Sequence, residues 1–144
     1  FVAIHDAARP CIVDPWIDAV FSAAERDGAA ILASPVVATL KRVDKQKHVT
    51  GTVDRESLWE AQTPQVFRRE LLMRAYAGRG KEPVTDDAQL VERLGHAVTV
   101  VPGSPLNLKI TTRDDLKLAE QALKVLPKPK LGFNNPFADD DLWR

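Results

Sequence analysis

The sequence predicts an α/β fold, in which helices cover a sheet of buried strands and a β-hairpin projects from it. Residues 1–34 read as strand, loop, helix and strand, the order of a βαβ unit in a parallel sheet. Residues 65–126 again alternate helices with short apolar strands, and two alternating runs separate these parts. We therefore divide the chain into α/β core (1–34), a β-arm (35–64), further α/β core (65–126) and an extended tail (127–144).

The first core segment predicts strand, helix and strand. Residues 1–5 read as a buried strand with no Met before it, so we expect upstream residues that were removed or that sit on another chain. A helix follows, with Asp14 as its cap, Pro15 at its first position and Gly28 at its end. The continuous apolar run 29–34 is typical of a strand buried on both faces of a parallel sheet.

Residues 35 to about 64 predict a hairpin arm. Residues 36–43 and 48–53 form two strand-like runs on either side of the charged tip 44–47. A two-stranded ribbon is only marginally stable alone. We therefore expect the arm to pack against something else, such as a second subunit.

The second core segment predicts two helices followed by two strands. The helices cover 68–78 and 85–95, and Thr85 is the expected cap of the second helix. The strands cover 97–101 and 107–110. This order continues the α/β pattern of the first segment.

A last helix and a tail end the sequence. Thr112 is the expected cap of this helix, which runs to about Leu126 with an inner face that includes Leu116, Ala119 and Leu123. The prolines and paired asparagines of 127–144 predict a tail and not a helix.

The composition excludes several classes of protein. Lys plus Arg and Asp plus Glu balance at 20 each, so no net field would draw the chain to nucleic acid or to anionic lipid. No apolar run approaches the roughly 18 to 20 residues that span a bilayer. The single cysteine, Cys11, excludes an internal disulfide and fits buried packing in a reducing compartment. Three scattered histidines and one cysteine offer no zinc constellation.

A charged motif stands directly after the first strand. In the segment His5-Asp6-Ala7-Ala8-Arg9-Pro10, a carboxylate and a guanidinium lie just beyond the strand's carboxyl end, where open α/β sheets bind ligands. Asp6 and Arg9 could equally pair with each other in a structural turn. Their spacing alone does not decide between a ligand site and such a turn.

Several blocks in order give the chain a family resemblance. From residue 1 to about 126 it resembles the 2-C-methyl-D-erythritol 4-phosphate cytidylyltransferase family. Each block alone is weak, and together in this order they are specific. The matching blocks are His5 to Pro10, Thr39-Leu40-Lys41-Arg42, Thr52-Val53-Asp54-Arg55 with Leu58-Trp59, Gln62-Thr63-Pro64-Gln65 with Phe67, Val84-Thr85-Asp86-Asp87, and Asn107-Leu108-Lys109-Ile110-Thr111 with Asp114-Asp115-Leu116.

The resemblance implies a Rossmann-like nucleotidyltransferase sheet and one reaction. CMP would pass from CTP to the phosphate of 2-C-methyl-D-erythritol 4-phosphate, with release of pyrophosphate and no covalent enzyme intermediate, in non-mevalonate isoprenoid biosynthesis. Such transfer needs cations and a metal around the reacting phosphates. The implied partners are these small molecules and a second copy of the chain bound through the β-arm. Neither nucleic acid nor a membrane is an expected partner. The implied location is the bacterial cytoplasm or the plastid stroma.

The resemblance also assigns roles to five residues of the core. Asp6 would be a Mg²⁺ ligand or orienter, because Mg²⁺ prefers one or two carboxylates plus phosphate oxygens. Arg9 would hold Asp6 or a phosphate, and Lys109 would lie near the reacting phosphates. Thr63 and Thr85 match contacts to the substrate phosphate. Thr85 would suit this role independently as a helix cap, because a helix amino terminus attracts anions.

Two further matched residues lie on the arm. The family's arm reaches the neighbouring subunit, so Thr39 and Arg55 would complete the partner's site and not their own. Arg55 suits bidentate phosphate recognition, and the alternative is an ion pair with Asp54 or Glu56 on a solvated ribbon.

The sequence departs from the family pattern in two places. The family's first half carries a Gly-rich loop that binds the CTP triphosphate, whereas the seven glycines here are scattered, so we expect the chain alone to bind CTP poorly. Ser104-Pro105-Leu106 stands where the family often carries an acid, which leaves a second metal carboxylate open. The competing hypotheses are a ribitol- or pentitol-phosphate cytidylyltransferase and a non-catalytic dimerising fragment. The Thr52 to Arg55 block with Leu58-Trp59, together with the Ala7-Ala8 pair, favours the methylerythritol enzyme.

Overall fold

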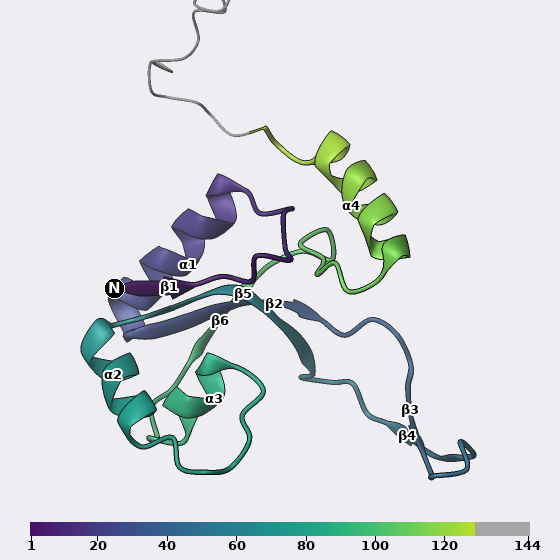
Figure 1. Ribbon diagram of the computed structural model, residues 1–144, viewed down its shortest axis with the longest axis horizontal. Helices are drawn as coiled ribbons and strands as arrows, with labels where there is room; N and C mark the ends of the chain where they lie inside the picture. The colour runs from purple at the N-terminus through teal and green to yellow at the C-terminus, as the bar shows by residue number, and fades with distance from the viewer. Residues whose placement is uncertain (129–144) are drawn as a thin grey trace, which may run out of the picture.

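The computed structural model describes residues 1–128 as a four-stranded sheet with helices on both faces and a separate two-stranded arm (Figure 1). The predicted α/β class is confirmed. Of the predicted tail, residues 129–144 lie outside the described part. No described helix is long and apolar enough to cross a membrane. The helices are α1 (Asp14–Asp27), α2 (Arg69–Ala77), α3 (Asp87–Glu92) and α4 (Arg113–Val125).

The sheet is mixed, which corrects the expectation of a parallel sheet. β1 and β2 both run antiparallel to β5, whereas β2 and β6 pair in parallel. β5 therefore separates the two strands of the predicted βαβ unit. The run Gln62-Thr63-Pro64-Gln65 in β5 is polar and contains a proline, so it gives no strand signal. In spatial order the strands are β1 (Val2–Ile4), β5 (Trp59–Phe67), β2 (Ala29–Pro35) and β6 (Thr99–Pro102).

Strand β2 divides the core into two layers, as alternation across a strand requires. Ala30 and Leu32 belong to the cluster on the α1 side, which also contains Val20 and Val66. The neighbouring residues Ala29 and Ile31 belong to the cluster with α2 and α3. The prediction that residues 29–34 form a strand buried on both faces is confirmed, since all six are buried.

Helix α1 covers the predicted residues but begins with a different cap. Val13 is the N-cap and makes no side-chain cap, while Asp14 is the first helical residue. The expectation of an Asp14 cap was therefore wrong by one position, although its carboxylate still lies in the favourable first turn. Gly28 ends the helix as predicted, with a φ of 90° that suits glycine.

Two predictions in the second core segment were wrong. Helix α3 is shorter than predicted and is capped by Asp86, whose side chain accepts a hydrogen bond from Gln89 N, and not by Thr85. Residues 107–110 form a loop and not a strand. The Ile110 N–H donates to the Ala8 carbonyl at 2.8 Å, which ties this loop to the one after β1 without forming a strand pair.

Helix α4 has the predicted capping box and a different inner face. The Thr112 hydroxyl accepts from the Asp115 N–H, and the Asp115 carboxylate accepts from the Thr112 N–H. Ala119 is buried as predicted, together with Ala122, against Cys11. The expectation for Leu116 and Leu123 was wrong, because both are 50% exposed. The helix packs through its two small alanines, which leaves the larger side chains beside them outside the contact.

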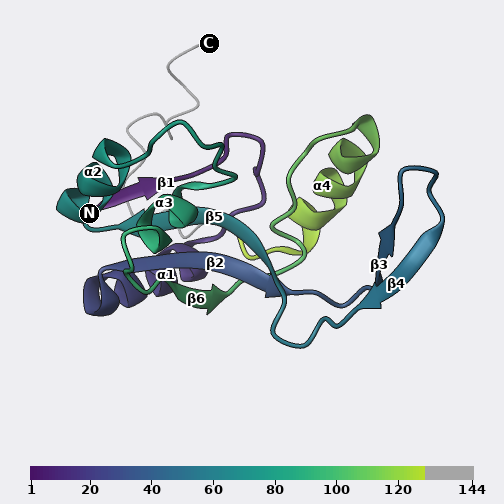
Figure 2. The ribbon, with the colours of Figure 1, turned by 90° about the horizontal axis from the view of Figure 1, so that it is seen from below.

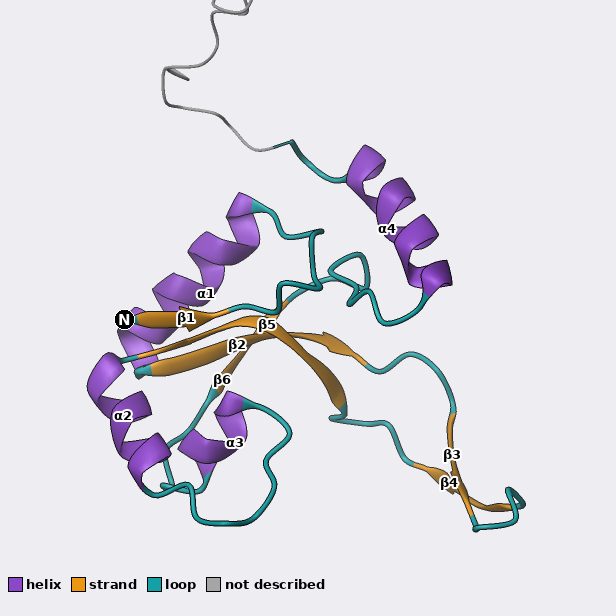
Figure 3. Cartoon of the chain, in the orientation of Figure 1, coloured by secondary structure: helices purple, strands orange, loops and turns teal. Residues whose placement is uncertain are grey.

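The arm extends from the sheet on the ends of β2 and β5 (Figures 2 and 3). Its two strands are β3 (Leu40–Val43) and β4 (Val49–Val53), which pair antiparallel and confirm the predicted hairpin. Several apolar side chains on it are open to solvent, with Val37 74%, Val43 52% and Val49 63% exposed. The arm thus offers apolar surface that its own ribbon does not cover.

Candidate active site

One cavity gathers the matched residues of the core at the carboxyl end of β1. It has a volume of about 290 Å³ and lies between the loop after β1, strand β5, the segment before α3 and the loop after β6. All five core residues to which the resemblance assigns roles line it. The complete lining is Ile4, Asp6, Arg9, Ala61, Gln62, Thr63, Gln65, Thr85, Asp86, Asp87 and Lys109.

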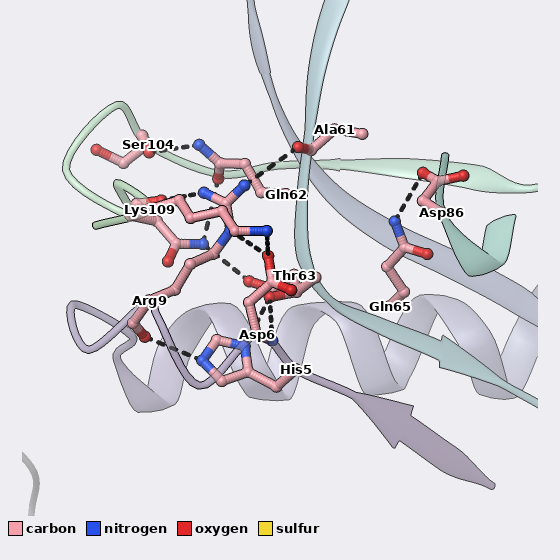
Figure 4. Close-up of polar contacts among 11 residues, drawn as sticks. His5, Asp6, Arg9, Ala61, Gln62, Thr63, Gln65, Asp86, Ser104 and Lys109 are labelled. Carbon is pink, nitrogen blue, oxygen red and sulfur yellow. Dashed lines mark hydrogen bonds and ion pairs between the residues drawn. The ribbon is translucent and has the colours of Figure 1, made fainter. Parts of the chain in front are cut away.

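Asp6 is the charged centre of this cavity (Figure 4). Its Oδ2 lies 3.1 Å from Lys109 Nζ and 3.3 Å from Arg9 Nε. Partial burial by itself raises the pKa of Asp6, but the hydrogen bond and charge of Lys109, followed by those of Arg9, outweigh it and hold the pKa below its usual range. Asp6 is therefore a carboxylate at neutral pH.

Arg9 holds Asp6 in place and is itself held. Its side chain is 12% exposed, and Nη1 donates to the Asn107 carbonyl at 2.6 Å, while Nη2 donates to the Ala61 carbonyl at 3.5 Å. With Nε directed at Asp6, the fork of the guanidinium is engaged on three sides. Of the roles considered for Arg9, this geometry favours orientation of Asp6 over contact with a phosphate. Asp6 and Arg9 also pair with each other, as the structural-turn alternative expected, and this ion pair lies within the site.

His5 joins the same loop to strand β5. Its Nε2 lies 3.0 Å from the Arg9 carbonyl oxygen and its Nδ1 lies 2.9 Å from Thr63 Oγ1. The Asp6 N–H donates to the same Thr63 oxygen at 3.0 Å. These contacts lock the loop and fix the backbone of Asp6 relative to β5.

A buried amide pair supports the site from behind. Asn107, which is 0% exposed, donates through Nδ2 to the Thr63 carbonyl at 2.9 Å and to Gln62 Oε1 at 3.3 Å. Gln62 Nε2 donates in turn to the Ser104 carbonyl at 2.8 Å. The loop after β6 is thereby attached to β5, which places Lys109 opposite Asp6. Among the described residues, Asn107 Oδ1 is buried without a hydrogen-bond partner.

A second buried amide places the acidic wall of the cavity. Gln65 Nε2 donates to Asp86 Oδ2 at 3.0 Å, and Gln65 Oε1 accepts from the Ala88 N–H at 3.0 Å. The Tyr76 hydroxyl donates to Asp87. Thr85 stands immediately before this cap, and its N–H donates to Gln89 Oε1 at 3.0 Å. Thr85 thus lines the cavity from an exposed segment and not as a helix cap.

The two arm residues lie away from this cavity. Neither Thr39 nor Arg55 contributes to its lining, and Arg55 donates to the carbonyl of Val37 on the arm itself. Within residues 1–128, Arg55 forms no ion pair with Asp54 or Glu56. The structure therefore brings together five of the seven candidate residues and leaves two on the arm.

The residues present fit one divalent cation held largely by phosphate. No group of three or more His, Cys, Asp or Glu side chains among the described residues could hold a metal ion. Asp6 Oδ2 contacts the cationic side chains of Arg9 and Lys109, so Oδ1 remains for a metal ion. Mg²⁺ typically binds one or two carboxylates and takes its other ligands from substrate phosphates and water. Asp6 alone meets that minimum.

The sequence reasoning missed the supporting role of Asn107 and the place of Asp86 and Asp87 in the cavity wall. Asn107 was expected in a strand, yet an amide between Leu106 and Leu108 is a signal for a buried polar group that needs partners. The two aspartates were noted only within the Val84-Thr85-Asp86-Asp87 block that resembles the family. No local sequence pattern predicts that the segment before α3 faces the loop after β1.

Comparisons with known proteins identify the family. A family model described as 2-C-methyl-D-erythritol 4-phosphate cytidylyltransferase matches residues 1–125. A protein of this name from Syntrophus aciditrophicus is 50% identical over 125 residues, which are 85% of this chain and 53% of that protein. Another, from Rhodopirellula baltica, is 50% identical over 122 residues, which are 85% of this chain and 49% of that one. The chain spans about half the length of the curated relatives it matches.

A solved structure agrees with the fold as well as the sequence. The crystal structure of 2-C-methyl-D-erythritol 4-phosphate cytidylyltransferase from Thermus thermophilus superposes with a TM-score of 0.78 at 40% identity, covering 86% of this chain and 62% of that one. The expected Rossmann-like nucleotidyltransferase fold is confirmed. The chain belongs to the 2-C-methyl-D-erythritol 4-phosphate cytidylyltransferase family.

Proposed function

We propose that the intact gene product transfers CMP from CTP to 2-C-methyl-D-erythritol 4-phosphate, in non-mevalonate isoprenoid biosynthesis. The observation that supports this best is the cavity around Asp6, which unites Arg9, Lys109, Thr63 and Thr85 from four separate segments. These are the core positions to which the family resemblance assigns roles. Beside its carboxylates, the cavity contains the cation of Lys109 and the hydroxyls of Thr63 and Thr85, which suit a small phosphorylated polyol.

The proposed reaction is a direct displacement at phosphorus. An oxygen of the sugar phosphate attacks the α-phosphorus of CTP, the bond from that phosphorus to the bridging oxygen breaks, and pyrophosphate leaves with the electron pair. Lys109, which is 47% exposed and 3.1 Å from Asp6, is free to approach phosphate oxygens as a point charge. Arg9 contributes by holding Asp6, and no residue of the chain needs to form a covalent intermediate.

We infer that Mg²⁺ is the cofactor and that Asp6 holds it. When bound, the cation would neutralise charge that develops on the reacting phosphates. The lowered pKa of Asp6 keeps this carboxylate ionised for that role. With Asp6 as the one carboxylate proposed to bind it, the affinity for the cation alone should be weak and should increase when CTP supplies phosphate oxygens.

We also infer a homodimer in which each arm serves the partner's cavity. Thr39 and Arg55 are exposed on the arm and away from their own cavity. The arm's exposed apolar side chains need a covering surface, and a second subunit would supply one. In such a dimer Arg55 would meet the sugar phosphate bound next to the partner's Asp6.

An activity assay on the intact gene product tests the reaction. Pyrophosphate release is measured with CTP and Mg²⁺, using methylerythritol phosphate and ribitol phosphate in parallel. The proposal expects turnover with the first substrate and a loss of about 100-fold or more in Asp6→Asn, with Asp114→Asn as a matched exposed control. Faster use of ribitol phosphate would favour the pentitol-phosphate alternative, and full activity of Asp6→Asn would overturn the metal role.

Mixed dimers test the shared site. Arg55→Ala and Asp6→Asn subunits should each be nearly inactive alone, because one lacks the arm's cation and the other lacks the carboxylate. A mixture that exchanges subunits should regain activity, since a heterodimer contains one site with both intact residues. Absence of recovery after verified exchange would mean that Arg55 does not act in the partner's cavity.

A further inference from the structure

Thr63 lies at the centre of hydrogen bonds whose direction follows from chemistry. His5 Nε2 is 3.0 Å from the Arg9 carbonyl oxygen, and His5 Nδ1 is 2.9 Å from Thr63 Oγ1 (Figure 4). A carbonyl oxygen only accepts hydrogen bonds, so Nε2 must carry a hydrogen. A neutral imidazole has one N–H, so its Nδ1 is then an acceptor. With this tautomer of the neutral ring, the Thr63 hydroxyl donates to His5.

The Thr63 hydroxyl can form only a limited number of further hydrogen bonds. A threonine hydroxyl has one hydrogen and two lone pairs. The hydrogen is used by His5, and one lone pair accepts from the Asp6 N–H at 3.0 Å. Because Thr63 lines the cavity, the second lone pair is what it can offer to a ligand there. Thr63 thus presents an acceptor to the cavity and no donor.

We propose that His5 is a positioning residue, which turns the hydroxyl hydrogen of Thr63 away from the cavity so that Thr63 accepts a hydrogen bond from an alcohol group of a polyol phosphate. This inference rests on the proposed function and deepens it. A dianionic phosphate brings only acceptors and would meet a lone pair at Thr63. The phosphate belongs nearer the cation of Lys109, whereas Thr63 recognises the alcohol part of the same substrate.

The tautomer of His5 can be measured without any substrate. Long-range ¹H–¹⁵N spectra of the ¹⁵N-histidine-labelled protein at neutral pH distinguish the two neutral tautomers and the imidazolium. The chain has three histidines, and the signals of His5 are assigned by their absence in His5→Asn. The proposal expects the neutral ring with its hydrogen on Nε2. A hydrogen on Nδ1, in either a neutral or a protonated ring, would overturn it.

Two amide variants separate the two contacts of His5 in the intact gene product. The shorter amide of His5→Asn can place its oxygen near the position of Nδ1 and keep an acceptor for Thr63. The longer amide of His5→Gln can place its N–H near Nε2 and keep the bond to the Arg9 carbonyl. We expect His5→Gln to raise the KM for the sugar phosphate about fivefold to tenfold, with kcat and the KM for CTP within about twofold. Because His5→Asn keeps the acceptor for Thr63, its KM for the sugar phosphate should lie below that of His5→Gln, and its Tm should fall with the loss of the contact to the Arg9 carbonyl.

The outcomes separate this proposal from the proposed function. Equal KM values in the two variants, or a larger KM in His5→Asn, would mean that His5 acts only by holding the loop. Thr63→Ser, which retains the hydroxyl, should rescue the KM that Thr63→Val loses, and equal losses would contradict the acceptor role. If the wild-type protein does not use methylerythritol phosphate at all, the proposed function fails, while the spectrum still decides the tautomer.

Discussion

Replacement of Gly103 by alanine is a sharp test of the buried amide pair behind the candidate site. A Cβ at this position would lie 2.5 Å from Gln62 Oε1 and 3.4 Å from the Ala33 carbonyl oxygen. The Gly103 N–H already donates to that carbonyl at 2.8 Å, so the backbone cannot retreat without losing a bond. We therefore expect the Gln62 side chain to move, although only 4% of it is exposed.

The expected loss in free energy of unfolding follows from the hydrogen bonds that Gln62 makes. Its displacement breaks the bond to the Ser104 carbonyl at 2.8 Å and the bond from Asn107 at 3.3 Å. A buried polar group left without a partner costs about 1–3 kcal/mol. With two such bonds affected and some relaxation of the loop, Gly103→Ala should lower the free energy of unfolding by about 2–4 kcal/mol.

Urea unfolding measures this loss, and two further variants control it. Gly51→Ala is the matched control on the arm, where an added Cβ meets nothing within 4 Å, and it should change stability by less than about 0.5 kcal/mol. In a Gln62→Ala background the clash is absent, so Gly103→Ala should cost less there by about 1.5 kcal/mol or more. Equal costs of Gly103→Ala in both backgrounds would refute the reasoning.

Three further predictions concern the core, the thiol and acid stability. Leu32→Ala, at a fully buried residue, should cost about 2–5 kcal/mol in urea unfolding, and a cost below about 1 kcal/mol would contradict the assigned packing. Burial raises the pKa of the Cys11 thiol, so native protein should resist a thiol reagent that labels it in urea, and equal rates would exclude this burial. Hydrogen bonds from Thr111, and then from Thr112, lower the pKa of Asp115 to about 2. Because the pKa is depressed in the folded state, the ionised Asp115 stabilises the fold above about pH 4, and this stabilisation is lost as the pH falls towards 2. Asp115→Ala should therefore remove this part of the pH dependence of the Tm. Parallel curves of Tm against pH for the two proteins would contradict the prediction.

Local signals predicted the elements whose ends are fixed by local chemistry. Gly28 ends α1 because its φ of 90° suits glycine, and Thr112 begins α4 through its capping box. The apolar run of β2 predicted a strand because burial on both faces removes any polar alternation. In each case the residues that carry the signal are neighbours in sequence.

The missed elements depend on contacts between distant segments. Gln62 and Gln65 lie in β5 because their amides find partners at Ser104 and Asp86, some 42 and 21 residues away. Neither polar residue favours a buried strand by itself. Residues 107–110 were predicted to be a strand because the apolar neighbours of Asn107 fit a strand pattern. In the structure, the Asn107 amide instead binds residues of β5 and holds this segment as a loop. The cavity contains core residues that the motifs singled out, whereas the strand that carries Gln62 and Gln65 was not predicted.

The candidate site divides into a part that this chain fixes by itself and a part that it does not. Asp6 is tied to β5 by Thr63 and to the loop after β6 by Lys109, so its position follows from the sheet. Thr39 and Arg55 lie on a ribbon whose apolar side chains are exposed. Phosphate recognition needs a cation held in a fixed geometry. In the homodimer proposed above, a second subunit would supply the surface that fixes the arm and would receive the Arg55 cation in the same contact.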